Sequence, residues 1–146
     1  METPTQVGPY RLGERIGSGG MAVVHEAARP GDPRLYAVKL PKLQNPDDTR
    51  AKENVLREIQ AQARLSHPHI APVLDWGETD GHLWIAMPRL EAERRLRPSR
   101  LSIAERLSLV DQLLDALAYA HVRGVIHRDV KPGNLLVEPT PDGPML

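Results

Sequence analysis

Three segments rich in apolar residues lie within the first 40 positions of the chain, at 10–16, 22–28 and 35–40. Short apolar segments bounded by turn residues predict β-strands. A glycine-rich turn at 17–20 joins the first two segments, and a Pro-Gly-Asp-Pro breaker at 30–33 precedes the third. The pattern therefore predicts a meander of three strands.

A helix is predicted after these strands. Asp47 and Asp48 offer carboxylates that can cap its first turn. The helix should run to about Leu65, because Pro68 pushes the residue before it out of the α region.

Two further strands are predicted at Ile70–Trp76 and Leu83–Met87. The turn Thr79-Asp80-Gly81 lies between them. Together with the meander they predict a five-stranded antiparallel sheet accompanied by one helix.

A second long helix carries the clearest local signals. Ser102 and Glu105 form a Ser-x-x-Glu capping box, and Gly124 supplies a C-terminal stop. A helix over residues 103–123 is about 30 Å long, enough for the spine of a helical lobe. We expect it to be half buried in a complete lobe, and we expect its apolar stripe to stay exposed in this chain. That stripe recurs at steps of four and three residues and comprises Ile103, Leu107, Val110, Leu114, Leu117 and His121.

Composition excludes several classes of protein. The chain of 146 residues has 19 Lys and Arg against 19 Asp and Glu, so no global field favours nucleic acid as a partner. It has no Cys, and no apolar run approaches the roughly 20 residues that span a bilayer. His67 and His69 flank Pro68, but without Cys or nearby acidic residues we interpret them as part of a loop rather than a metal site.

The segment His127-Arg128-Asp129-Val130-Lys131-Pro132-Gly133-Asn134 carries the most specific chemistry. Asp129 can accept the proton of an attacking hydroxyl, and Lys131 can neutralise a γ-phosphate. Asn134 can hold Mg²⁺ through its amide oxygen. The whole octapeptide is far more specific than any one of its residues, and it indicates phosphoryl transfer.

The glycine-rich turn Gly17-Ser18-Gly19-Gly20 is a second element. Glycines let backbone N–H groups approach phosphate oxygens, which a Cβ would obstruct. A strand is predicted on each side of the turn, whereas a dinucleotide fingerprint needs a helix directly after the glycines. Ala22 stands where a third glycine often occurs.

Lys39 is the third element. The period of two places Ala37 and Lys39 on one face of their strand, where a small residue can cover a flat base while the amine reaches phosphates. Glu58 follows in the first helix, where Leu56 and Ile59 should face inward, and its carboxylate could hold the ammonium of Lys39. The alternative for Glu58 is an ordinary surface charge.

With these elements in one order, the chain resembles the eukaryotic-type Ser/Thr protein kinases, and Gly19-Gly20-Met21-Ala22 is most similar to their bacterial members. The resemblance implies an α+β fold with a five-stranded antiparallel N-lobe, one helix, and the beginning of a helical C-lobe. It also implies ATP and Mg²⁺ as cofactors, Asp129 as catalytic base, Lys131 at the γ-phosphate and Lys39 paired with Glu58. Asn134 would be a Mg²⁺ ligand.

The resemblance also implies a nucleotide site. Met87 would be the gatekeeper, and the Pro88 carbonyl and the Leu90 backbone would form the hinge hydrogen bonds. The glycine-rich segment would cover the phosphates, and the adenine would lie between side chains above and below it. The implied cofactor-binding residues are Ile16, Gly17, Ser18, Gly19, Gly20, Met21, Ala22, Val23, Val24, Ala37, Lys39, Met87, Pro88, Leu90 and Leu136.

The expected domain organisation follows the same resemblance. We expect an N-terminal extension at 1–9, the N-lobe at 10–87, the hinge at 88–91 and a partial C-lobe at 92–146. The Asp-Phe-Gly segment of the family is absent, and the chain has no Phe at all. We therefore expect a kinase domain truncated before that motif.

The expected function is transfer of the ATP γ-phosphoryl group to Ser or Thr hydroxyls of protein substrates, with little or no activity in this chain as given. The alternative is a pseudokinase-like module that binds nucleotide or a partner without catalysis. We expect a cytoplasmic protein with no membrane segment and no nucleic-acid partner.

Overall fold

The structure, a computed structural model, divides into two compact units. The first comprises Met1–Arg64 and Pro72–Arg89, and the second comprises Leu65–Ala71 and Leu90–Leu146. The residues that the structure describes are 3–18, 22–45, 47–89, 98–125, 138–140 and 143–145.

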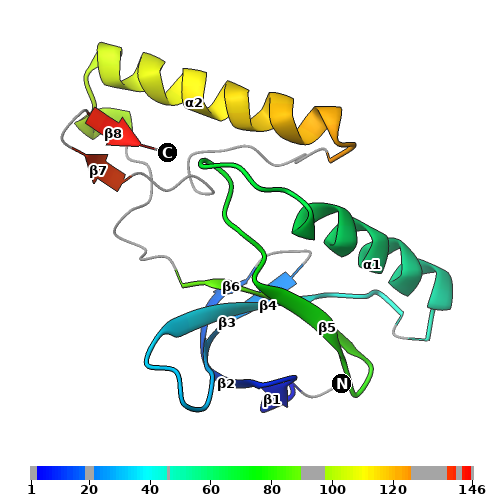
Figure 1. Cartoon of the computed structure of the whole chain (residues 1–146). Helices are drawn as coiled ribbons and strands as arrows, with labels where there is room; N and C mark the ends of the chain where they lie inside the picture. The colour runs from blue at the N-terminus through cyan, green and yellow to red at the C-terminus, as the bar shows by residue number, and fades with distance from the viewer. Residues whose placement is uncertain are drawn as a thin grey trace. The chain divides into compact units, whose positions relative to one another are not determined.

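A six-stranded sheet forms most of the first unit (Figure 1). Its order is β1-β2-β3-β4-β6-β5, and all neighbouring strands pair antiparallel. The antiparallel sheet is as predicted, but β1 is an additional strand. The strands are β1 (Gln6–Val7), β2 (Tyr10–Ser18), β3 (Ala22–Ala28), β4 (Leu35–Pro41), β5 (Asp75–Thr79) and β6 (His82–Pro88).

The strand predicted at Ile70–Trp76 is wrong in its position. Regular pairing starts only at Asp75, since Pro72 has no N–H to donate to a ladder. Leu74 then donates its N–H to Ala86 at 2.8 Å, which brings the chain alongside β6. The predicted turn is confirmed, because Asp80 and Gly81 connect β5 to β6 with positive φ of 49° and 83°.

One helix, α1 (Thr49–Ala63), packs against the sheet of this unit. The Asp48 carboxylate accepts a hydrogen bond from the Ala51 N–H at 3.0 Å, which confirms the predicted cap. Ile59 is 3% exposed and packs with Leu83 and Ile85 of β6. Partly buried residues join this cluster, namely Val55, Leu56, Val73 and Met87.

The opposite face of the sheet encloses Trp84. Its indole forms an edge contact with Tyr10, with ring centroids 5.6 Å apart, and Tyr10 makes a similar contact with Tyr36. The Trp84 ring leaves no room for side chains at two glycines. A Cβ on Gly8 would lie 2.6 Å from the ring and a Cβ on Gly77 would lie 2.9 Å from it. The cluster as a whole comprises Val7, Tyr10, Ala27, Tyr36, Val38, Leu40, Trp84 and Ala86.

The hydroxyl of Thr79 connects the two ends of the sheet. It accepts one hydrogen bond from the indole Nε1–H of Trp84 and another from the backbone N–H of Gly8, both at 3.1 Å. Gly8 lies in the turn between β1 and β2, whereas Thr79 ends β5 on the other edge. The sheet therefore curls around the indole until its first and last strands meet.

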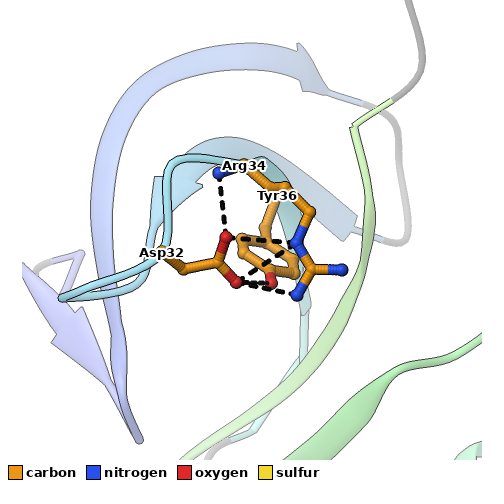
Figure 2. Close-up of polar contacts among 3 residues, drawn as sticks. All are labelled: Asp32, Arg34 and Tyr36. Atoms are coloured by element: carbon orange, nitrogen blue, oxygen red, sulfur yellow. Dashed lines mark hydrogen bonds and ion pairs between the residues drawn. The ribbon is translucent and has the colours of Figure 1, made fainter.

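A polar cluster fixes the start of β4 (Figure 2). Arg34 donates to both carboxylate oxygens of Asp32, and the buried Tyr36 donates its hydroxyl to the same carboxylate. These hydrogen bonds, first from Arg34 and then from Tyr36, hold the pKa of Asp32 far below its ordinary value of 3.8. The same contact with Asp32 raises the pKa of Tyr36.

The second unit is built around α2 (Ile103–Val122), which follows the short 3₁₀ helix η2 (Pro98–Arg100). Ser102 and Glu105 form the predicted capping box, and the Ser102 N–H lowers the pKa of the Glu105 carboxyl. The helix ends as predicted at Gly124, whose φ is 81°. The N–H groups of Gly124 and Val125 bond back to the last turn, which completes a Schellman motif.

The strands β7 (Glu138–Thr140) and β8 (Gly143–Met145) form a separate two-stranded sheet in this unit, and β8 lies against α2 (Figure 1). No helix within the described ranges is both long and apolar enough to cross a bilayer.

Two apolar faces run along α2. The buried face carries Leu109, Ala116 and Ala120. The predicted stripe lies on the other side of the helix, and most of it is exposed, as expected for this chain. Its exposed apolar members are Ile103, Leu107, Val110 and Leu114, with exposed fractions from 48% to 75%.

The loop containing His67 is tied to α2. The His67 Nδ1 accepts the N–H of His69 at 3.0 Å, so Nε2 carries the ring hydrogen and donates it to Asp115 at 3.1 Å. The Ser66 N–H donates to the Tyr119 hydroxyl at 3.0 Å. His67 thus serves as a packing and hydrogen-bonding residue of the second unit.

We expect Gly77→Ala to destabilise the first unit by about 1–3 kcal/mol, because the new Cβ overpacks against the indole of Trp84. Gly13→Ala is the matched control, since a Cβ there meets only the Glu26 carbonyl oxygen at 3.4 Å. Thermal unfolding followed by circular dichroism measures both. Equal midpoints for the two variants would contradict the close packing around Trp84.

We expect Asp32→Asn to lower the unfolding midpoint at neutral pH. The folded pKa of Asp32 is depressed, so its carboxylate stabilises the fold above about pH 4 and loses that contribution as the pH falls through and below the unfolded pKa. The difference in unfolding midpoint between wild type and Asp32→Asn should therefore shrink on acidification from pH 7 to pH 3. A difference that stays constant over this range would exclude the ionised carboxylate as the cause.

We expect the 146-residue chain to self-associate through the exposed stripe of α2. Replacing Leu107 and Leu114 with Glu should shift its mass toward that of a monomer in sedimentation at high concentration. The control is a double replacement of the exposed Ala104 and Ser108 with Glu, which adds the same charge away from the stripe. A wild-type chain that is monomeric throughout, or an equal response to both double variants, would contradict the prediction.

Candidate functional site

Four of the predicted site residues lie side by side on three neighbouring strands. Val24 of β3 pairs with Lys39 of β4, and Ala37 of β4 pairs with Met87 of β6. Directly paired residues of antiparallel strands project from the same face. Since Tyr36, Val38 and Leu40 of β4 belong to the Trp84 cluster, Ala37 and Lys39 project from the opposite face, as predicted.

This face is largely apolar and carries a single ammonium among the four residues. Ala37 is 6% exposed, while Val24, Lys39 and Met87 are half-buried. Met87 packs against the cluster formed by Ile59, Leu83 and Ile85, which joins the face to α1. Because the side chain of Ala37 is small, it leaves space on this face beside the bulkier Lys39 and Met87.

The glycine-rich turn connects two strands, as predicted. Gly17 pairs with Val24, and Ser18 pairs with Val23. A Cβ on Gly17 would meet Val24 at 3.8 Å, an ordinary contact, so packing against these strands does not require a glycine there. Gly19, Gly20 and Met21 lie outside the described residues. The strand that follows the turn excludes the helix that a dinucleotide fingerprint requires.

Ile16 and Ala22 flank the same turn. Ile16 is half-buried near the end of β2, and Ala22 is 8% exposed at the start of β3, where it pairs with Pro41. The pairing of β2 with β3 shifts between Arg15 and Gly17, so the turn is preceded by an irregularity in the ladder.

Lys39 and Glu58 do not form an ion pair in this structure. Glu58 is exposed on α1, whereas Lys39 is half-buried in β4. The ion pair that connects α1 to the sheet in the described residues joins Lys52 to Glu78 of β5. The predicted pairing of Lys39 with Glu58 stays a prediction.

The chain leaves the sheet at Pro88, which pairs with Tyr36. Arg89 donates its N–H to the Leu35 carbonyl at 3.4 Å, and its Nη1 lies 2.9 Å from Oε2 of Glu26 on β3. Neither Glu26 nor Arg89 was among the predicted site residues. Glu26 lies two residues after Val24, and Arg89 lies two residues after Met87, which indicates the shared face. That the two side chains meet is shown by their ion pair in the structure.

The segment 126–137 lies outside the described residues. It contains four predicted site residues, Asp129, Lys131, Asn134 and Leu136. The predicted hinge residue Leu90 also lies outside them.

Comparisons with known proteins agree with the fold. Residues 10–143 match the family described as "Protein kinase domain". The chain is 37% identical over 131 residues to the serine/threonine-protein kinase PknJ of Mycobacterium tuberculosis, which covers 88% of this chain and 22% of PknJ. It is 38% identical over 137 residues to PknE of the same organism, covering 91% of this chain and 24% of PknE.

Solved structures give the same result. The crystal structure of the PknI kinase domain of M. tuberculosis has a TM-score of 0.70 and 35% identity, covering 93% of this chain and 58% of that chain. A double mutant of the same domain has a TM-score of 0.74 and 34% identity, covering 97% of this chain and 60% of that one. The predicted kinase-like fold is confirmed. The chain spans less than a quarter of the length of PknJ and PknE.

Proposed function

The chain belongs to the protein kinase domain family, and on that basis we propose that it forms the nucleotide-binding part of a Ser/Thr protein kinase. The proposed reaction transfers the γ-phosphoryl group of Mg-ATP to Ser or Thr hydroxyls of protein substrates. The observation that carries the proposal is the strand register that groups Val24, Ala37, Lys39 and Met87 on one face of the sheet. Apolar groups around one ammonium suit a planar base attached to phosphates.

The sheet contributes Ile16, Val24 and Ala37 to the base end of the proposed site. The family resemblance assigns Leu136 to the same site. Met87 is the gatekeeper, and the hinge hydrogen bonds come from the Pro88 carbonyl and the Leu90 backbone. Pro88 suits this role although it has no N–H, because its carbonyl can accept a hydrogen bond from adenine.

The phosphate end uses backbone and charge. In the proposed site the N–H groups of the segment from Gly17 to Val23 bind the phosphate oxygens, and Ser18 is exposed at the start of the turn. Lys39 contacts the α- and β-phosphates. Glu58 pairs with Lys39 in the nucleotide-bound state, which orients the ammonium.

The transfer step rests on three residues of the segment 127–134. Asp129 accepts the proton of the substrate hydroxyl, Lys131 neutralises charge on the γ-phosphate, and Asn134 contributes an oxygen ligand to Mg²⁺. Bound Mg²⁺ supplies the positive charge that the phosphate oxygens need during transfer. We further propose that the protein acts in the cytoplasm, where ATP is available.

A non-catalytic module that binds nucleotide or a partner protein is the second candidate. The separation of Lys39 from Glu58 favours it, because an unpaired lysine is less well positioned for transfer. Binding of Mg-ATP without protein phosphorylation, by a version of the chain extended through an Asp-Phe-Gly segment, would select this candidate.

We expect Lys39→Met to weaken Mg-ATP binding at least about tenfold, because it removes a charge-assisted hydrogen bond to the phosphates. Isothermal titration of the 146-residue chain measures the affinity. Lys52→Met is the control, since it makes the same substitution at a lysine that pairs with Glu78 instead. Unchanged affinity in Lys39→Met, or an equal loss in Lys52→Met, would contradict the role of Lys39.

A further inference from the structure

Arg89 lies where the chain leaves β6, and the backbone holds it only weakly there. Pro88 has no N–H, so it donates nothing to β4. The next donor is the Arg89 N–H, and its distance of 3.4 Å to the Leu35 carbonyl oxygen is long for such a bond. Backbone pairing alone therefore gives this end of the strand little support.

The side chain of Arg89 provides a second attachment. Its Nη1 lies 2.9 Å from Oε2 of Glu26, a typical length for a charge-assisted hydrogen bond. The two side chains are 35% and 29% exposed, so the pair is partly shielded from water. Glu26 belongs to β3 and Arg89 follows β6, so the side chains meet across the intervening strand β4.

The register places this ion pair next to Ala37. Glu26 pairs with Ala37, and Ala37 pairs with Met87. Arg89 comes two residues after Met87 and so projects from the same face. The guanidinium and the carboxylate therefore border the face that carries Val24, Ala37 and Met87.

Two other ion pairs in the described part of the first unit involve an Arg or a Lys, and both lie elsewhere. Arg34 and Asp32 are two residues apart in one turn, and Lys52 connects α1 to Glu78 on β5. The Arg89–Glu26 pair connects β3 to the first residues of the predicted hinge, across the intervening strand β4.

We propose that the Glu26–Arg89 ion pair closes the outer edge of the adenine site and holds the hinge in position for base recognition. Arg89 is then a positioning residue that acts through the Pro88 carbonyl, and the inference rests on the proposed function. It acts on the base and not on the phosphates, in contrast to Lys39. This difference separates the two roles experimentally.

The test measures binding of three probes to the 146-residue chain by isothermal titration: Mg-ATP, adenosine and Mg-tripolyphosphate. Arg89→Gln should weaken Mg-ATP and adenosine about fivefold, the upper range for a partly exposed ion pair, and leave tripolyphosphate unchanged. Glu26→Gln should give the same pattern. Lys39→Met should weaken Mg-ATP and tripolyphosphate and leave adenosine unchanged.

Two further variants control for indirect effects. Exchanging the charges with Glu26→Arg and Arg89→Glu together should restore at least half of the lost adenosine affinity. Arg34→Gln, which breaks an ion pair away from the hinge, should leave all three affinities unchanged. Thermal unfolding midpoints should agree among wild type, Arg89→Gln and the exchanged variant.

The outcomes separate the inference from the proposed function. Unchanged adenosine binding in Arg89→Gln, with weakened Mg-ATP binding in Lys39→Met, would overturn the role of Arg89 and leave the proposed function intact. An equal loss for all three probes in Arg89→Gln would reveal general disruption and also overturn it. A wild-type chain that binds neither Mg-ATP nor adenosine would overturn both.

Discussion

The enclosure of the Trp84 indole by the curled sheet is the constraint on which the first unit depends. The ring belongs to the larger apolar cluster, and its N–H donates a hydrogen bond to the Thr79 hydroxyl. The same hydroxyl also accepts a hydrogen bond from the Gly8 N–H. Side chains alternate along a strand, so burying Trp84 on one side commits Ile85 and Met87 to the other. Lys39 and Ala37, which pair with Ile85 and Met87, therefore project from that same side of the sheet. The same packing that stabilises the sheet therefore decides which residues face a ligand.

Much of the fold could be predicted because its signals are local. The Asp48 cap, the Ser102–Glu105 capping box and the Gly124 stop each depend on a few adjacent residues, and the structure has all three. The strand β1 was missed because two residues carry no detectable period. On α2 the large apolar residues define the exposed stripe, whereas the buried face relies partly on the small Ala116 and Ala120, whose contribution to a hydrophobic pattern is slight.

The candidate site was predictable to the extent that it follows from alternation within one strand. Ala37 and Lys39 share a face because they are two residues apart. The separation of Lys39 from Glu58 depends instead on where α1 rests, and this is set by the packing of Ile59 and by the Lys52–Glu78 pair. The contact of Glu26 with Arg89 depends on the register of three strands, which no single segment encodes.

The packing of Gly8 and Gly77 against Trp84 has a consequence for how the sequence can change over time. Gly8 has a positive φ of 52°, which disfavours a side chain whatever surrounds it. At Gly77 the crowding from a side chain is relieved when the indole is replaced by a smaller ring. That replacement in turn removes the donor to Thr79 and leaves a void. Substitutions at Gly77 and Trp84 are thus coupled, and a lineage that keeps Trp84 loses stability when Gly77 gains a side chain.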